Sequence, residues 1–203
     1  MAQRHTVKAI ILAASIAVAV AAAIYTSKNP HEARPVPLPD LVAGAPESIT
    51  VSSPAFPRGG TIPAKYTCDG ADVSPPLAIE NVPAQARSLL LLVYDPDAPG
   101  GVFVHWVLYD VPRGLSALPE GVPRDPAVEG LGLQGRNGFG KTGYNGPCPP
   151  RGDRPHRYVF LVIALDVESL GLEPGSPWSA VLDRASGHVV AYGYTYGVYA
   201  RQG

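Results

Sequence analysis

Three stretches of the chain place side chains that can donate or accept protons next to apolar runs. The first is Asp95-Pro96-Asp97-Ala98-Pro99, the second starts at His105, and the third contains His156 and Tyr158. Imidazole and phenol groups can donate hydrogen bonds to an anion, and a carboxylate can orient a neighbouring imidazole. Each stretch alone also has an ordinary structural explanation, because Asp and Pro form rigid turns. Together they predict a small anion-binding pocket, provided that the fold brings them together.

Strand alternation indicates where these side chains point. If His105 lies in a strand, it shares a face with Val107, and Trp106 takes the opposite face. The turn after residue 94 returns the chain toward His105, so we expect Asp95 or Asp97 to fix the tautomer of this imidazole.

The third stretch follows the same rule. His156 and Tyr158 share a strand face, while Arg157 takes the other. The loop Gly146-Pro147-Cys148-Pro149-Pro150 precedes this strand and is expected to form a wall of the pocket.

An enzymatic alternative uses some of the same residues. Asp95, Asp97, His105 and His156 could hold a divalent metal, or act as general acid and base on a phosphoester. The chain has no Ser or Cys in a Gly-x-Ser-x-Gly nucleophile elbow. We therefore expect no catalysis and no cofactor.

Cys68 and Cys148 are the only cysteines, and both lie in predicted loops. An even cysteine count in an oxidising compartment is compatible with a disulfide, but the sequence leaves two free thiols equally open. Neither cysteine belongs to a Cys-x-x-Cys pair, so no zinc or other metal site is expected.

The elements that must position these residues are mainly strands. Continuous apolar runs predict buried strands at 89–94, 103–111 and 158–165, the first two paired as a hairpin, and a weaker strand at 48–53. Between 190 and 198, bulky residues recur at every second position, which predicts another strand. The tyrosines Tyr192, Tyr194 and Tyr196 on its bulky face could line a ligand groove or simply pack on the sheet. Residues 112–153 are rich in Gly and Pro and are expected to form loops.

One helix is predicted, at 178–186. Ser176 is expected to be its N-cap, Pro177 its first residue, and Gly187 its C-terminal stop. With 22 Gly and 23 Pro in 203 residues, the composition favours a β-rich fold with a few short helices. Lys and Arg total 16 against 17 Asp and Glu, without a basic run, so nucleic acid is not an expected partner.

The N-terminal region differs from the rest of the chain. Residues 9–24 are apolar except for Ser15 and follow Arg4 and Lys8, which is typical of an export signal. We therefore expect a signal peptide or membrane anchor at 1–25, a Pro-rich linker without packed structure at 26–47, and one domain at 48–203. The domain would be extracytoplasmic, either periplasmic or secreted, and anchored to the inner membrane by residues 7–25 if these are not cleaved.

The motifs resemble the signature regions of the phosphatidylethanolamine-binding protein (PEBP) family. The matching segments are residues 95–99, His105-Trp106, Gly146-Pro147-Cys148-Pro149-Pro150 and His156-Arg157-Tyr158, in this order. Residues 65–70 and 74–77 resemble its bacterial branch, the YbhB/YbcL or Raf-kinase-inhibitor-like proteins. Asn137-Gly138-Phe139 and the tyrosine-rich last strand depart from that pattern.

The resemblance implies antiparallel β-sheets around a small cavity for phosphate or a phospholipid head group. Asp95, His105, Gly146, His156 and Tyr158 would bind the anion, with Pro96, Asp97 and Cys148 in supporting positions. The role implied is binding, with regulation or inhibition as a possible use. The alternatives are an inhibitor of an extracytoplasmic protease or other protein partner and, with less support, a phosphoesterase.

Overall fold

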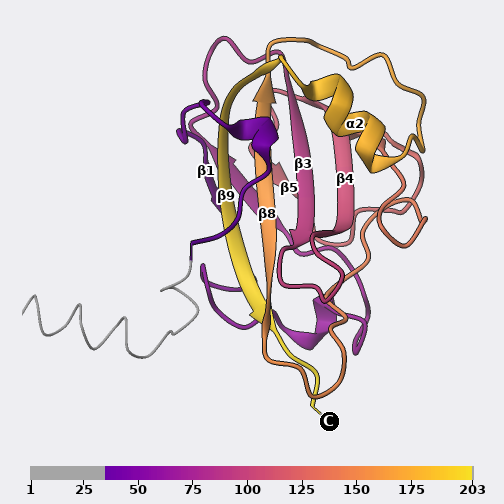
Figure 1. Ribbon diagram of the computed structural model, residues 1–203. Coiled ribbons are helices and arrows are strands. Elements are labelled where there is room, and N and C mark those ends of the chain that lie inside the picture. The colour runs from indigo at the N-terminus through magenta and orange to yellow at the C-terminus, as the bar shows by residue number, and fades with distance from the viewer. Residues whose placement is uncertain (1–34, 203) are drawn as a thin grey trace, which may run out of the picture. The chain divides into compact units, whose positions relative to one another are not determined.

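The structure, a computed structural model, describes residues 35–202 (Figure 1). The predicted signal peptide or anchor, and the first part of the predicted linker, lie outside the described residues. Among residues 35–202, no helix is both long enough and apolar enough to cross a membrane.

Two antiparallel sheets form the domain. The larger sheet has the strand order β6-β7-β4-β3-β8-β9, and the smaller has the order β1-β2-β5. All their pairings are antiparallel. The strands are β1 (Thr50–Ser52), β2 (Leu77–Glu80), β3 (Ser88–Asp95), β4 (Phe103–Pro112), β5 (Ala117–Leu118), β6 (Ala127–Val128), β7 (Gly132–Gln134), β8 (His156–Leu165) and β9 (Val189–Tyr199).

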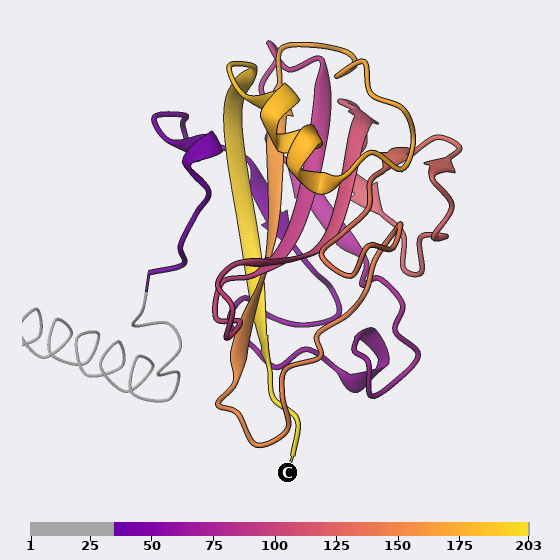
Figure 2. The same ribbon diagram turned by 45° about the vertical axis from the view of Figure 1, so that its right-hand side comes forward.

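Helical structure in the described chain is limited to three short elements. They are the 3-10 turns η1 (Asp40–Val42) and η2 (Ala64–Tyr66) and the α-helix α2 (Trp178–Ala185). The expected β-rich fold with few short helices is confirmed. Figure 2 shows α2 lying across one face of the large sheet, where it packs against β4.

The central strands form where continuous apolar runs predicted them. Every residue of β3 and of β8 is buried, and β3 pairs with β4 on one side and with β8 on the other. The hairpin of β3 and β4 is confirmed, with register shifts that interrupt the pairing at two places. Because both faces of the large sheet are covered, its central strands need no polar alternation.

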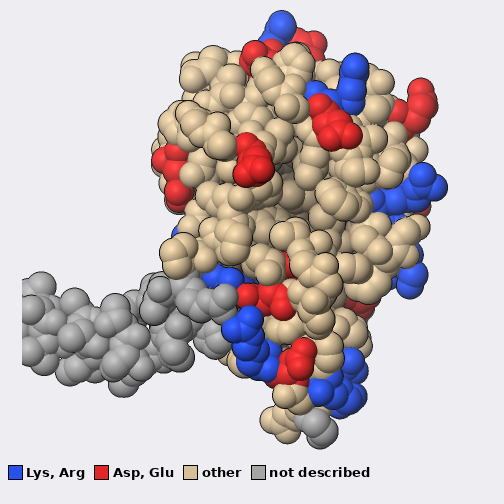
Figure 3. Space-filling view, viewed as in Figure 1, with Lys and Arg blue, Asp and Glu red and all other residues tan. Residues whose placement is uncertain are grey.

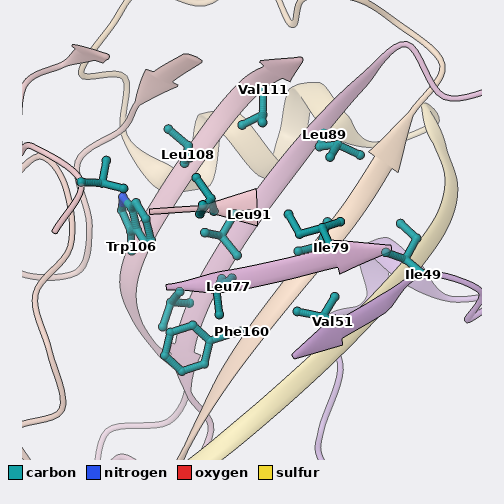
Figure 4. Packing of buried hydrophobic residues seen from close by; sticks show 14 of the residues in the cluster. Ile49, Val51, Leu77, Ile79, Leu89, Leu91, Trp106, Leu108, Val111 and Phe160 are labelled. Atoms are coloured by element: carbon teal, nitrogen blue, oxygen red, sulfur yellow. The ribbon is translucent and has the colours of Figure 1, made fainter. Parts of the chain in front are cut away.

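The main core lies between the two sheets. Figure 4 shows the strand that carries Leu77 and Ile79 crossing in front of the large sheet, with Leu91 and Phe160 of the large sheet close to it. Trp106 is fully buried in this cluster, as expected. The expected strand alternation does not hold at His105, because the pairing of β4 with β3 shifts between Val104 and Trp106 and the His105 ring contacts Tyr158, a member of the same cluster. Burial of each such apolar side chain contributes about 1.5–3 kcal/mol, so this layer fixes the position of the large sheet.

The predicted linker is wrong in its second half. The compact domain begins at Pro37 rather than at Ser48. Val42 is buried, the hydroxyl of Tyr94 donates to the carbonyl oxygen of Pro37 at 2.7 Å, and Glu47 forms a β-bridge with Tyr192. The proline-rich sequence limits regular secondary structure here to the short turn η1, but it does not prevent packing against the sheet.

The helix prediction is confirmed in position but wrong at its N-terminus. Pro177 is the N-cap residue and no side chain caps the helix, because the hydroxyl of Ser176 donates to the carbonyl of Glu173 instead. Gly187, with φ of 85°, follows the last turn as expected for a helix stop.

Candidate functional site

The candidate site lies at the end of the large sheet where three neighbouring strands begin or end. Asp95 is the last residue of β3, His156 is the first of β8, and His105 lies near the start of β4. The antiparallel order β4-β3-β8 brings these ends together. A cavity of about 180 Å³ opens here, and it is lined by Asp95, Ala98, Pro99, Phe103, His105, Phe139, Cys148, Pro149, Pro150, His156 and Tyr158.

His105 is held by the loop and not by a carboxylate. Its Nδ1 lies 2.7 Å from the carbonyl oxygen of Asn145, so Nδ1 carries the proton and donates. The expectation that Asp95 or Asp97 fixes this tautomer is therefore wrong. Burial lowers the pKa of His105, and the Asn145 carbonyl, Asp95, the Gly146 backbone and Asp72 oppose this shift without cancelling it.

Aromatic rings surround the His105 imidazole. Its centroid lies 5.2 Å from that of Tyr158, 5.3 Å from that of Phe103 and 5.5 Å from that of Phe139, all with edge-to-face geometry. This packing keeps the ring in one orientation.

His156 is the imidazole that a carboxylate orients. Its Nδ1 lies 2.8 Å from Oδ2 of Asp95, and both side chains are almost fully buried. On the other side of the ring, Nε2 lies 3.6 Å from Oδ2 of the half-exposed Asp153, too far for a hydrogen bond. Asp95 thus fixes the ring, and Nε2 lies toward Asp153 without forming a hydrogen bond to it.

Tyr158 brings a hydroxyl group to the cavity. Its Oη is buried and makes no hydrogen bond of standard geometry within the described chain, although the Asp95 carboxylate and the Cys148 backbone lie near it. Burial, and then the charge of Asp95, raise the pKa of Tyr158 far above its ordinary value, so the group remains a neutral phenol. Since buried hydroxyls are nearly always hydrogen-bonded, this one is available to a ligand.

Two residues predicted in supporting positions lie away from the cavity. Pro96 does not line it, and Asp97 turns to the opposite face, where its carboxylate binds Arg157 through Nε at 2.7 Å and Nη2 at 2.9 Å. Arg157 is on the face opposite His156 and Tyr158, as alternation predicted. The set of Asp95, Asp97, His105 and His156 therefore does not converge on one point. Within residues 35–202 no group of three His, Cys, Asp or Glu side chains is arranged to hold a metal ion.

Gly146 also lies behind the cavity wall and not in it. Its amide donates to Oδ1 of Asp72 at 2.7 Å, so it is not free to bind an anion. A Cβ at this position would lie 2.2 Å from the carbonyl oxygen of Tyr66. Gly146 is required because two loops approach closely here, and this approach places Cys148, Pro149 and Pro150 at the cavity.

The cavity-lining loop is attached to the loop before β2 by a disulfide. Cys68 and Cys148 are bonded, and the amide of Cys68 also donates to the carbonyl of Pro147. Of the two alternatives that the sequence left open, the structure has the bridge.

Two functional residues escaped the sequence reasoning. Phe139 lines the cavity, and the buried Asn137 donates to Oδ1 of Asn145 at 2.8 Å and to the carbonyl of Gly143 at 2.9 Å. Asn137 thus holds the loop whose carbonyl orients His105. The signal was the Asn137-Gly138-Phe139 segment, which stood out only as a departure from a familiar pattern.

The tyrosines of β9 pack on the sheet and do not line the cavity. The guanidinium of Arg58 lies 4.2 Å from the ring centroid of Tyr194. The small residues between the tyrosines face the other way, where a Cβ on Gly193 would lie 1.9 Å from the carbonyl oxygen of Ile49. The role of lining this cavity is therefore not supported for these tyrosines.

The sequence and the fold match known proteins. The family model described as phosphatidylethanolamine-binding protein matches residues 52–200. A UPF0098 protein of Aquifex aeolicus is 48% identical over 153 residues, which cover 75% of this chain and 89% of the relative. A UPF0098 protein of the archaeon Pyrococcus abyssi is 45% identical, covering 80% of this chain and 90% of the relative. The description of the matching group as bacterial is therefore too narrow.

Two solved structures share the fold. Escherichia coli YbcL superposes with a TM-score of 0.69 at 32% identity, covering 76% of this chain and 99% of that one. A phosphatidylethanolamine-binding protein homologue from Chlamydia trachomatis gives a TM-score of 0.68 at 38% identity. The match covers 77% of this chain and 99% of that one. Sequence, fold and family model agree, and the chain belongs to the phosphatidylethanolamine-binding protein family.

Proposed function

We propose that this protein binds a small oxyanion, such as phosphate or a phospholipid head group, in the cavity between β3, β4 and β8, without catalysing a reaction. The observation that carries the proposal is the buried hydroxyl of Tyr158, which makes no hydrogen bond of standard geometry within the described chain and lines the same cavity as two imidazoles of fixed orientation. A ligand oxygen would accept the hydrogen bond that the protein leaves unmade.

The lining of the cavity supports binding over chemistry. It contains no Ser, Thr or Lys, and its cysteine, Cys148, is in a disulfide. Covalent catalysis through a serine, a threonine, a lysine or a free thiol therefore has no support among the described lining residues.

The rim favours an anion that is attached to a carbon chain. Pro99, Phe103 and Phe139 give the mouth of the cavity an apolar character, and Phe139 is 45% exposed. A head group with a glycerol or similar moiety would cover this apolar surface, whereas inorganic phosphate would not.

Titration calorimetry and thermal unfolding of the full chain with phosphate and with glycerophosphoethanolamine test the proposal. A ligand that binds only the folded state raises the melting temperature once its concentration exceeds its Kd. We expect both ligands to stabilise the protein, glycerophosphoethanolamine more strongly, and His105→Ala and His156→Ala to remove the effect.

His188→Ala is the matched control. His188 pairs with Asp166 at the same 2.8 Å separation as His156 and Asp95, but it lies outside the cavity lining. Stabilisation that is equal in the parent and in all three variants, or absent from the parent, would refute the proposed site.

We further propose that the domain works outside the cytoplasm. Support comes from the apolar N-terminal segment in the sequence and from the Cys68–Cys148 disulfide, since such bonds persist mainly in oxidising compartments. Nucleic acid is not a proposed partner: on the face seen in Figure 3, blue and red side chains are interspersed near the C-terminus and no broad basic area stands out.

Fractionation of cells, with thiol alkylation before lysis, tests the proposed location outside the cytoplasm. Cytoplasmic protein with both thiols alkylated would contradict it.

A further inference from the structure

The hydrogen bonds of the two cavity histidines determine which ring nitrogens carry protons. His105 donates from Nδ1 to a carbonyl oxygen, and His156 donates from Nδ1 to a carboxylate. Neither acceptor can itself donate, so both Nδ1 atoms are protonated. A neutral imidazole carries one N–H, and in its neutral form each ring therefore presents Nε2 as a lone-pair acceptor.

The cavity has few other groups that could hold an anion. Tyr158 supplies one donor, and no Lys or Arg among residues 35–202 lines the cavity. Asp95 lies in the lining, and Asp153 lies beside His156. A fully ionised oxyanion would thus meet one phenol donor, two imidazole lone pairs and the carboxylate of Asp95, with Asp153 close by, and this is an unfavourable environment for a negative charge.

One proton changes this balance. When a proton lies between a ligand oxygen and an Nε2 atom, a hydrogen bond joins the lone pair of Nε2 to the ligand. The positive charge of the added proton also offsets the negative charge of the anion. Free His105 disfavours that proton because burial lowers its pKa. A bound anion supplies the missing opposite charge, so the proton and the anion favour each other's binding.

His105 is the better site for this proton. Nε2 of His156 already faces the carboxylate of Asp153 at 3.6 Å, which competes with any ligand for a proton placed there. The ring of His105 is enclosed by Phe103, Phe139 and Tyr158, and its Nδ1 donates to the carbonyl oxygen of Asn145. The charged and titratable groups facing His105 are Asp95 and Asp72, with Tyr158 and His156 in the same cavity.

We propose that the cavity binds its oxyanion together with one proton, held between a ligand oxygen and Nε2 of His105. This inference rests on the proposed function. It defines the ligand as an oxyacid that either brings one proton, as a phosphate monoester does near its pKa of about 6, or takes it up from solvent on binding.

Sulfate is the sharpest probe, because it has no proton to release between pH 6 and 8. Titration calorimetry of the full chain with sulfate at pH 6, 7 and 8, in two buffers of different ionisation enthalpy, measures the affinity and the proton uptake together. We expect uptake of about one proton and an affinity that rises about tenfold per pH unit on acidification, until the pH falls to the pKa of free His105. Methyl phosphate should show a smaller change toward pH 6, where it carries its own proton.

Two glutamine variants locate the proton. His105→Gln replaces the titrating nitrogen with an amide that donates at every pH, so we expect it to bind sulfate without pH dependence and without proton uptake. His156→Gln should bind more weakly but keep the pH dependence. Loss of the pH dependence in His156→Gln and not in His105→Gln would overturn the assignment to His105.

The outcomes separate this inference from the proposed function. Sulfate binding with constant affinity and no proton uptake would overturn the proton-coupled mode and leave the anion site intact. No binding of sulfate, phosphate or methyl phosphate at any pH would instead refute the anion site itself. If His105→Gln does not fold, the ¹⁵N chemical shift of Nε2 of His105 in the parent protein still tests the proton-coupled mode. On addition of sulfate, this shift must change from the value of an unprotonated acceptor nitrogen to that of a protonated nitrogen.

Discussion

Nδ1 of His156 lies 2.8 Å from Oδ2 of Asp95, and the first residue of β8 is thereby fixed to the last residue of β3. Both side chains are almost fully buried. The bond joins two residues that line the cavity, and it gives Asp95 a role in holding the site rather than in contacting the ligand.

Replacement of Asp95 tests this role. Asp95→Ala leaves a buried Nδ1–H without an acceptor, so we expect a loss of about 1–3 kcal/mol in the free energy of unfolding, measured in urea. Asp153→Ala is the control, because Asp153 is half exposed and 3.6 Å from the other ring nitrogen. That variant should lose less than about 1 kcal/mol. Similar losses in both variants would mean that the Asp95 bond is no stronger than a surface contact.

Tyr158 should show opposite effects on stability and on binding. Tyr158→Phe removes a buried hydroxyl that makes no hydrogen bond of standard geometry within the described chain, so we expect the free protein to gain up to about 1 kcal/mol. The same change removes a donor to the ligand, and phosphate affinity should fall about five- to tenfold. Urea unfolding and titration calorimetry measure the two effects.

Tyr144→Phe provides the comparison for this prediction. Tyr144 is equally buried, but its hydroxyl donates to the carbonyl oxygen of Tyr66 at 2.7 Å. Its loss should cost about 1–2 kcal/mol. If Tyr158→Phe destabilises the protein as much as Tyr144→Phe does, the Tyr158 hydroxyl has a protein partner after all.

The close approach at Gly146 should make this position intolerant of any side chain. Gly146→Ala would place Cβ 2.2 Å from the carbonyl oxygen of Tyr66, and the loops must separate to accommodate it. We expect a loss of about 1–3 kcal/mol and weaker anion binding, because the moved loop carries Cys148, Pro149 and Pro150. Gly114→Ala, where a Cβ meets no atom within 4 Å, should change stability by less than about 1 kcal/mol. A Gly146→Ala protein as stable as Gly114→Ala would contradict the packing described.

The sequence predicted the strands well because their burial leaves a strong signal. The runs in β3 and β8 are apolar at every position, and a run of that length between turn residues admits few other structures. Alternation also placed Trp106 in the core and set Arg157 opposite His156, since a two-residue period leaves no choice once one face is known.

The partners of the histidines were not predictable in the same way. Asp95 lies at the end of the central strand β3, which has β4 on one side and β8 on the other. Either histidine was therefore within reach, and the choice depends on side-chain directions near a register shift between Val93 and Tyr94. The acceptor for His105 is a backbone carbonyl, that of Asn145, in a loop without periodicity. No pattern of residue types encodes such a contact.

The ion pair of Asp97 and Arg157 yields the last prediction. Arg157 is 3% exposed, and three of its donors, including its backbone amide, contact the Asp97 carboxylate. Burial alone would raise the pKa of Asp97, but the hydrogen bonds and charge of Arg157, helped by Arg154, outweigh it and lower this pKa. We expect Asp97→Asn to cost about 3 kcal/mol at pH 7, because it leaves a buried guanidinium facing a neutral amide.

The pH dependence follows from the direction of that shift. Asp97 has a lower pKa in the folded than in the unfolded protein, so its stabilising effect is complete above the unfolded value near 3.8 and is lost as the pH falls through the folded value. The difference in unfolding free energy between the parent and Asp97→Asn should therefore shrink below pH 4. Arg154→Gln, which removes an exposed partner 3.6 Å from Asp97, should cost less than about 1 kcal/mol. A pH-independent cost of Asp97→Asn would show that the amide disturbs packing, and that the charge of Asp97 is not what stabilises this face of the sheet.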